Sequence, residues 1–193
     1  MSRTMRFAVL VSSLLSLLAT MTSTAGAVTW HNSGSTAFTA TTGAGTLSST
    51  SAALNCTSGT QTGTAPALTV GVTYAVSGTA TFSGCSLGGV ATGIDCGFTF
   101  TGTSQSGSVT SGTADVTCRV YQFNSQLCHL EGTVSAVYTN GPVGVFFWAT
   151  GGNVVSTDTS LGHCPLGHGD RVHLSAWTFR TTSANPPRIT RTA

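Results

Sequence analysis

The stretch that decides the fold is Ile94-Asp95-Cys96-Gly97-Phe98-Thr99-Phe100-Thr101. Apolar residues take every second position in it, and polar or small residues take the others, so an extended chain places all the apolar side chains on one face. The aromatic and Cβ-branched residues suit a pleated, half-buried surface. The sequence therefore predicts a strand with one face in a core and the other in solvent.

The same alternation appears on both sides of this stretch. It runs through residues 73–82, 113–120 and 128–138, whereas Val143–Ala149 begins as a continuous apolar run that is typical of a central strand covered on both faces. A last strand is expected near residues 171–180. Gly-rich turns separate these segments and no helical periodicity intervenes. We predict an all-β, antiparallel β-sandwich, Ig-like or jelly-roll-like, with about 8–10 strands.

Six cysteines add a second constraint on the fold. An even number of cysteines behind a secretory signal predicts three disulfides, and their places on or near the inward faces put the bridges in the core. The absence of C-x-x-C spacing argues against structural zinc. One pair, Cys118 and Cys128, flanks Gln122-Phe123-Asn124 symmetrically, and a three-residue hairpin loop there would place the two opposite each other. The expected disulfide residues are Cys56, Cys85, Cys96, Cys118, Cys128 and Cys164.

The first residues have the order of a secretory signal. Basic Arg3 and Arg6 precede an apolar run over residues 7–18, and Ala25-Gly26-Ala27 gives the small-x-small pattern of a cleavage site. The apolar run is shorter than the roughly 20 residues of a membrane span. We predict a signal peptide over residues 1–27 and a secreted, extracellular protein without a transmembrane segment after cleavage. The alternative is an uncleaved N-terminal anchor.

The sequence after residue 27 is typical of one domain with few charged residues. We expect a single β-sandwich domain over residues 28–183 and a flexible C-terminal tail over 184–193, because Pro186-Pro187 ends the patterned part. After cleavage five arginines balance five acids, and the chain has no lysine. A protein that neutralises phosphates needs clustered basic residues, so a nucleic-acid partner is not expected.

Two patterns suggest catalysis, and neither has the required context. Residues 84–88 fit G-x-S-x-G around Ser86, but that motif works on a sharp strand-to-helix turn, and Gly89-Val90-Ala91-Thr92-Gly93 is a poor helix former. Glycoside hydrolysis needs a positioned pair of carboxylates. Asp95 and Asp115 fall on outward faces, where solubility explains them. We therefore predict no catalytic residue, no cofactor and no enzymatic activity.

A histidine-rich segment over residues 163–173 raises the question of a metal. Blue-copper proteins place a Cys, a His and a Met on one loop, with a second His upstream. Cys164, His168 and upstream His129 fit three of those places, with His173 in place of the absent Met. Use of Cys164 would leave an odd number of cysteines. The favoured interpretation is a disulfide-bonded Cys164 beside exposed histidines, with a metal-binding sandwich as an alternative.

Aromatic residues provide another functional alternative. A row of exposed rings on a secreted sandwich would make a carbohydrate-binding module, although most aromatic residues are expected in the core. Such a carbohydrate-binding role predicts a row of solvent-facing aromatic side chains, and burial of all three tryptophans would remove it. The aromatic candidates are Trp30, Tyr74, Tyr121, Tyr138, Trp148 and Trp177.

Two short steps carry a resemblance to a group of known proteins. Phe82-Ser83-Gly84-Cys85 and Cys164-Pro165-Leu166-Gly167 are similar to the F-x-G-C and C-P-x-G steps of small, secreted, Thr/Gly-rich six-cysteine β proteins from GC-rich Gram-positive bacteria. The resemblance implies a β fold and an extracellular location, and that group has no assigned activity. The leading hypothesis is a secreted or cell-surface, non-enzymatic protein that binds or structures an unknown extracellular ligand or cell-envelope component.

Overall fold

The computed structural model describes residues 27–158, 164–175 and 177–193, with the side chains of 149–152 left out. The predicted signal peptide, apart from Ala27, lies outside this part. The described chain is built of β-strands without a helix, and so contains no helix with the length and hydropathy to span a bilayer. The all-β prediction is confirmed.

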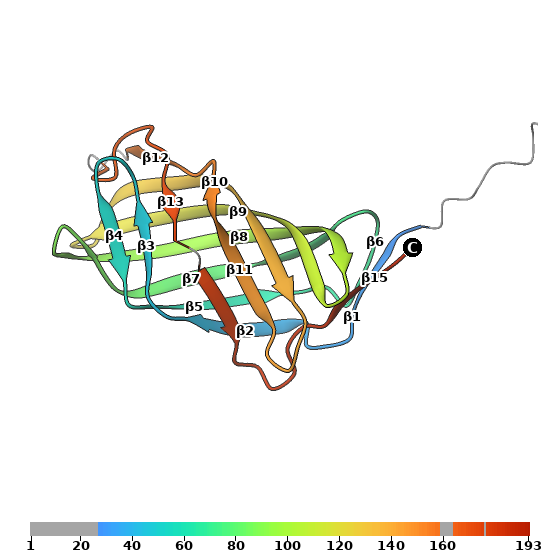
Figure 1. Cartoon of the computed structure of the whole chain (residues 1–193). Helices are drawn as coiled ribbons and strands as arrows, with labels where there is room; N and C mark the ends of the chain where they lie inside the picture. Colours follow the sequence, from blue (N-terminus) through green and yellow to red (C-terminus); the bar gives the residue numbers. More distant parts are fainter. Residues whose placement is uncertain (1–26, 159–163, 176) are drawn as a thin grey trace, which may run out of the picture.

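Eight of the strands form a sheet that closes on itself (Figure 1). Each strand pairs antiparallel with the next around the ring, and β8 pairs with β7 to close it. The prediction of a two-sheet sandwich is therefore wrong in its architecture: the structure is a closed barrel. In ring order the strands are β7 (Tyr74–Leu87), β5 (Ser58–Thr64), β2 (Ala37–Thr42), β14 (Trp177–Thr181), β11 (Val145–Gly152), β10 (Ser125–Thr139), β9 (Val109–Gln122) and β8 (Val90–Ser106).

The four longest strands, β7 to β10, follow one another as hairpins and form one side of the barrel. A two-residue turn, Phe123-Asn124, joins β9 to β10, and both residues have positive φ, at 49° and 65°. The expected three-residue loop is absent. The two-residue turn and a bulge between Gln126 and Cys128 together set the register, so Cys128 pairs with Val120 and Cys118 pairs with Leu130. The predicted Cys118–Cys128 disulfide is therefore wrong.

Three disulfides staple the described chain, as predicted. All six cysteines are buried. The first bridge joins β4 (Ala53–Cys56) to β7, the second joins neighbouring strands β8 and β9, and the third joins β10 to the segment after β12 (Val155–Asp158). The pairs are Cys56–Cys85, Cys96–Cys118 and Cys128–Cys164.

Aromatic side chains fill the interior of the barrel. The rings of Trp148 and Trp177 lie 6.3 Å apart, and Phe82 lies 4.1 Å from Trp177 between ring centroids. A second group surrounds Phe146, whose ring lies 5.0 Å from that of Phe38. Together with the other buried side chains of the barrel strands, these rings make the interior a packed core, so a functional surface is expected outside it.

Short strands flank the barrel at its two ends (Figure 1). At one end β3 (Gly45–Ser48) pairs with β4 and with β13 (His173–Leu174), and β12 pairs with β10. At the other end β1 (Thr29–Asn32) lies between β6 (Leu68–Val70) and β15 (Ile189–Thr192) in a separate three-stranded sheet. Residues 189–192, expected in a flexible tail, therefore form a paired strand with buried Ile189.

Candidate functional site

The outer wall of the barrel is rich in threonine and serine over β2, β5, β7, β8, β9 and β10. Outward residues from neighbouring strands lie opposite one another, so their hydroxyls form rows across the wall. The hydroxyl groups of Thr62 and Thr79, for example, form a hydrogen bond with 3.2 Å between their oxygens. One row runs through Thr39, Thr62, Thr79, Gly97, Thr117 and Glu131.

A shallow groove follows this row. Gly97 lies between Thr79 and Thr117 and contributes no side chain, so the wall is hollowed there, with a volume of about 510 Å³. Adjoining hollows share Thr79 on one side and Thr117 on the other. Together these shallow hollows follow the row from β2 across to β10 and β12, and we call them the wall groove.

Tyr121 borders the wall groove. It lies opposite Gly93 on β8, and a Cβ at that glycine would lie 4.0 Å from Cδ2 of the tyrosine ring and 3.9 Å from its Cβ. The ring thus lies beside bare backbone, where another residue would place a side chain. Tyr121 is partly exposed, so a half-buried aromatic ring remains open to a ligand at this edge of the groove.

Charged residues stand beside the hydroxyl row. Asp95 lies opposite Arg119, which lies opposite His129 on the next strand. His129 Nε2 lies 3.3 Å from the carboxylate of Glu131. These groups give the groove both hydrogen-bond donors and acceptors, and ionised groups make the stronger hydrogen bonds.

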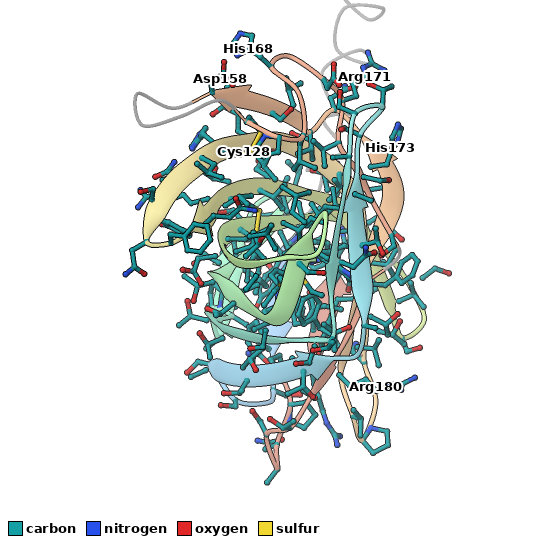
Figure 2. All side chains as sticks on the ribbon, turned by 90° about the vertical axis from the view of Figure 1, so that its left-hand side faces the viewer. Cys128, Asp158, His168, Arg171, His173 and Arg180 are labelled. Atoms are coloured by element: carbon teal, nitrogen blue, oxygen red, sulfur yellow. A yellow bond between two sulfur atoms is a disulfide. The ribbon has the colours of Figure 1, made fainter. Side chains whose placement is uncertain are left out.

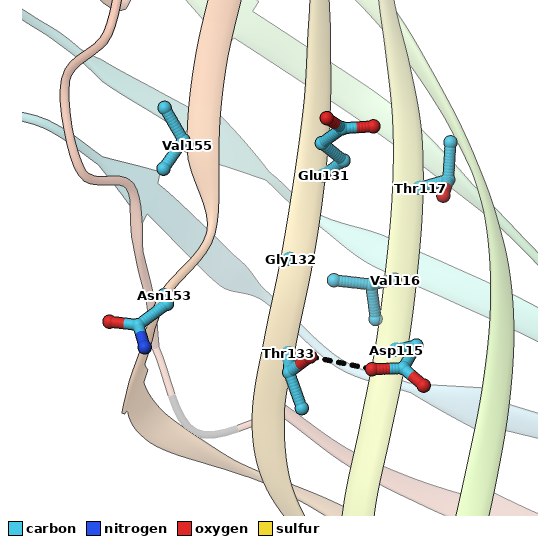
Figure 3. Close-up of a pocket in the computed structure, with 8 residues that line it drawn as sticks. All are labelled: Asp115, Val116, Thr117, Glu131, Gly132, Thr133, Asn153 and Val155. Carbon is cyan, nitrogen blue, oxygen red and sulfur yellow. Dashed lines mark hydrogen bonds between the residues drawn. The ribbon is translucent and has the colours of Figure 1, made fainter.

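The end of the groove at β10 is shown in Figure 3. Thr133 donates its hydroxyl proton to Oδ1 of Asp115 at 2.5 Å, which holds that carboxylate at the groove edge. Asn153 and Val155 border the hollow on the far side of β10. Asp115 was expected only to aid solubility, and the structure places it on this groove.

The predicted metal candidates do not gather in one place. Cys164 is bonded to Cys128, so its thiolate is not available as a copper ligand. His168 lies beside Asp158, with 3.6 Å between Nδ1 and Oδ2, while His173 lies apart on β13 (Figure 2). Throughout the described ranges no three His, Cys, Asp or Glu side chains are grouped to hold a metal ion.

The catalytic and aromatic candidates are placed differently from what their motifs suggest. Ser86 lies near the end of β7, opposite Asn55 and Ala91, and not on a strand-to-helix turn. Trp30, Trp148 and Trp177 are at most 1% exposed, so a carbohydrate-binding role that depends on a row of exposed aromatic side chains is excluded. Tyr74 and Tyr138 are buried as well, and Tyr121 is the one of the six candidates that borders the groove.

Comparisons with protein-family models, with curated proteins and with solved structures found no match to this chain. The wall groove is therefore the feature of the described chain that points to a function.

Proposed function

We propose that this protein is a non-enzymatic, extracellular binding protein whose wall groove holds a neutral polysaccharide. The observation that carries the proposal is the threonine hydroxyls on both sides of the hollow at Gly97, with the single ring of Tyr121 at its border, and not a row of exposed aromatic side chains. Hydroxyls of a glycan pair with side chains that both donate and accept hydrogen bonds, as threonine does.

The shape of the groove favours a polymer over a small molecule. Pockets for small ligands enclose most of the ligand surface, whereas this groove is open along its length. It crosses six of the eight strands of the closed barrel, which at a spacing of about 4.8 Å gives a curved path of about 24 Å around the outer wall. Several consecutive sugar units would therefore lie across the strands.

The charges beside the groove favour an uncharged chain. Asp95, Asp115 and Glu131 border it against a single arginine, Arg119. An anionic polymer would meet more like charge than opposite charge there. The carboxylates instead accept hydrogen bonds from sugar hydroxyls, and the face of Tyr121 offers an apolar surface to the C–H groups of a sugar ring.

An extracellular location agrees with this ligand. Structural disulfides persist in oxidising compartments, and the three bridges join two barrel strands to each other and two flanking segments to the barrel. The N-terminal order of basic, apolar and small residues supports export by a cleavable signal. A culture medium that contains the chain beginning at Val28 would support this part of the proposal, and retention of the intact chain inside the cell would contradict it.

Affinity electrophoresis tests the ligand class. The protein is run through gels that contain soluble β-glucan, glucomannan or starch, and retardation by at least one neutral glycan is expected. Tyr121→Ala removes the stacking surface, and Thr79→Val with Thr117→Val removes two hydroxyls at nearly constant volume. Each variant is expected to weaken binding by about tenfold or more, the loss of roughly 1.4 kcal/mol.

Thr113→Val is the matched control. Thr113 is exposed on the outer face of β9, opposite Thr101 and Ser135, and does not line the wall groove. Its substitution should leave retardation unchanged. The proposal fails if none of the glycans retards the protein, or if Thr113→Val and the groove variants weaken binding equally.

A further inference from the structure

An exposed apolar cluster lies at the end of the barrel, away from the wall groove. Within a stretch of five residues Leu68 is 56% exposed, Val70 67% and Val72 71%. The first two belong to β6, the outermost strand of the small sheet formed with β1 and β15. Exposed apolar side chains on an edge strand are unfavourable in water unless something covers them.

The backbone of β6 is arranged to receive another strand. Thr69 pairs with Trp30, and the flanking bonds Asn32 N–H to Ala67 O and Gly71 N–H to Val28 O fix the hydrogen-bonded positions. In an antiparallel ladder the residues between such positions turn their N–H and C=O groups the other way. Those of Leu68 and Val70 therefore point to the open edge.

The opposite edge of the same sheet is covered. On β15, the side-chain amide of Gln105 donates to Ile189 O at 2.6 Å and accepts from Arg191 N–H at 2.5 Å. Asn140 adds bonds to both the N–H and the C=O of Ile189. Within the described ranges, side-chain amides thus cover the β15 edge, and no further strand pairs with the apolar edge at β6.

We propose that β6 pairs with β6 of a second copy of this chain, antiparallel about a two-fold axis at Thr69. In this register Leu68 of each copy faces Val70 of the other. Both residues direct their N–H and C=O groups outward, so each pair exchanges two backbone hydrogen bonds, and apolar side chains meet on the same face. The two small sheets become one six-stranded sheet.

The strip is self-complementary, and this selects a second copy as the occupant. A two-fold interface uses the same patch twice, so residues symmetric about its centre must match. Apolar Leu68 and Val70 are symmetric about Thr69, and residues 64–75 contain no charged side chain that would meet its like across the axis. Because few residues take part, we expect a reversible dimer at the small end of protein interfaces.

Pairing would join two wall grooves in one particle. This consequence rests on the proposed function, since a dimer that binds two segments of one polysaccharide gains avidity from effective concentration. The pairing itself does not depend on glycan binding. A dimer without glycan affinity would overturn only the proposed function, and a glycan-binding monomer would overturn only this inference.

Analytical ultracentrifugation of the secreted chain tests the pairing. Sedimentation coefficients should rise with concentration toward a dimer between about 1 μM and 1 mM. Val70→Lys should weaken self-association by about tenfold or more, because it places a charge in the apolar strip. Val143→Lys is the control, since Val143 is 45% exposed and lies outside the strip.

A pair of charge variants tests the register. Leu68→Lys/Val70→Lys and Leu68→Glu/Val70→Glu should each be monomeric alone, because like charges face each other across the axis. Mixed, they should form a one-to-one heterodimer. A wild-type chain that stays monomeric to about 1 mM overturns the proposal and leaves the edge to a strand of another protein. A dimer that the β6 variants leave intact overturns it as well.

Discussion

Gln61 of β5 lies directly opposite Ala80 of β7, and its side chain is buried in the interior of the barrel. Ala40 lies opposite it on the other side. Neither the amide nitrogen nor the amide oxygen of Gln61 has a hydrogen-bond partner among the residues that the structure describes. A buried polar group without a partner loses its hydration and gains nothing in return.

Gln61→Met is therefore expected to stabilise the protein. Methionine has a similar length and no polar group to desolvate, so the free energy of unfolding should rise by about 1–3 kcal/mol. Chemical denaturation of the oxidised protein, followed by tryptophan fluorescence, measures the change. A lower denaturation midpoint for Gln61→Met would mean that the amide is satisfied in solution.

The same substitution at Gln105 should have the opposite effect. Gln105 makes two hydrogen bonds to the backbone of β15, which Gln105→Met would remove. We expect the free energy of unfolding to fall by about 0.5–1.5 kcal/mol, since the Arg191 N–H loses its partner and the Ile189 C=O keeps only the bond from Asn140. Hydrogen exchange should locate the loss of protection in residues 189–192.

The turn between β9 and β10 contains a residue with an unfavourable backbone conformation that a substitution should relieve. Phe123 is 89% exposed and has a φ of 49°, a left-handed conformation that costs an aromatic residue about 1 kcal/mol. Tight hairpin turns with two such residues favour Asn-Gly. Phe123→Asn with Asn124→Gly should raise the free energy of unfolding by about 1–2 kcal/mol in a denaturation experiment.

The neighbouring hairpin gives the control for this prediction. Gly88 and Gly89 join β7 to β8, with φ of 59° and 83°. Gly88→Ala introduces a Cβ at such a φ and should lower stability by about 1 kcal/mol, although no other atom lies within 4 Å of the new methyl group. A stabilising Gly88→Ala would show that backbone conformation does not control either turn.

The local pattern in the sequence is sufficient to predict the strands, but it is not sufficient to predict how the strands assemble. Alternation at residues 94–101 correctly predicts a strand with a buried face, because period 2 depends only on neighbouring residues. Closure depends on β2 pairing with β14, some 140 residues away, and on β7 pairing with β8. A sandwich and a closed barrel have the same inward and outward pattern along each strand, so the pattern does not separate them.

The wall groove could not be predicted from the sequence, because it also depends on how the strands pair. Gly97 is one of many glycines in the sequence, and its role follows from the register that places it between Thr79 and Thr117. Tyr121 was one of six aromatic candidates, and alternation with buried Val120 was the signal that would have placed its ring outside the core. The separation of Cys118 from Cys128 likewise depends on a turn whose first residue, Phe123, is atypical of its class, whereas the actual partner, Cys96, lies opposite Cys118 on β8.

Close packing between β3 and the ring of Trp177 predicts opposite effects of substitution at Gly45 and at nearby Gly43. A Cβ at Gly45 would lie 1.3 Å from Nε1 of Trp177, whose indole packs on the backbone of β3. Gly45→Ala should therefore lower the free energy of unfolding by about 3 kcal/mol, because a rigid buried ring has to move. Gly43 has nothing within 4 Å, so Gly43→Ala should be neutral or raise stability by about 0.5 kcal/mol. Equal melting temperatures for the two variants would contradict this packing.

Two buried tyrosines predict a loss of stability at high pH. Burial raises the pKa of Tyr74 and of Tyr138 well above the ordinary phenol value near 10. Tyr74 donates its hydroxyl to Pro66 O, and Tyr138 donates to Pro187 O. Above about pH 10 the unfolded chain releases these protons while the folded chain keeps them, so the unfolded state binds fewer protons and stability falls as the pH rises.

Denaturation curves at a series of pH values between about 8 and 11.5 measure this effect. The free energy of unfolding should be constant with respect to these two groups below about pH 9 and should decline above pH 10, at up to about 1.4 kcal/mol per pH unit for each tyrosine. Tyr74→Phe should lower stability at pH 8, where it loses a hydrogen bond, and should reduce the slope above pH 10. A slope that Tyr74→Phe leaves unchanged would mean that its phenol ionises at the same pH in the folded and unfolded chains.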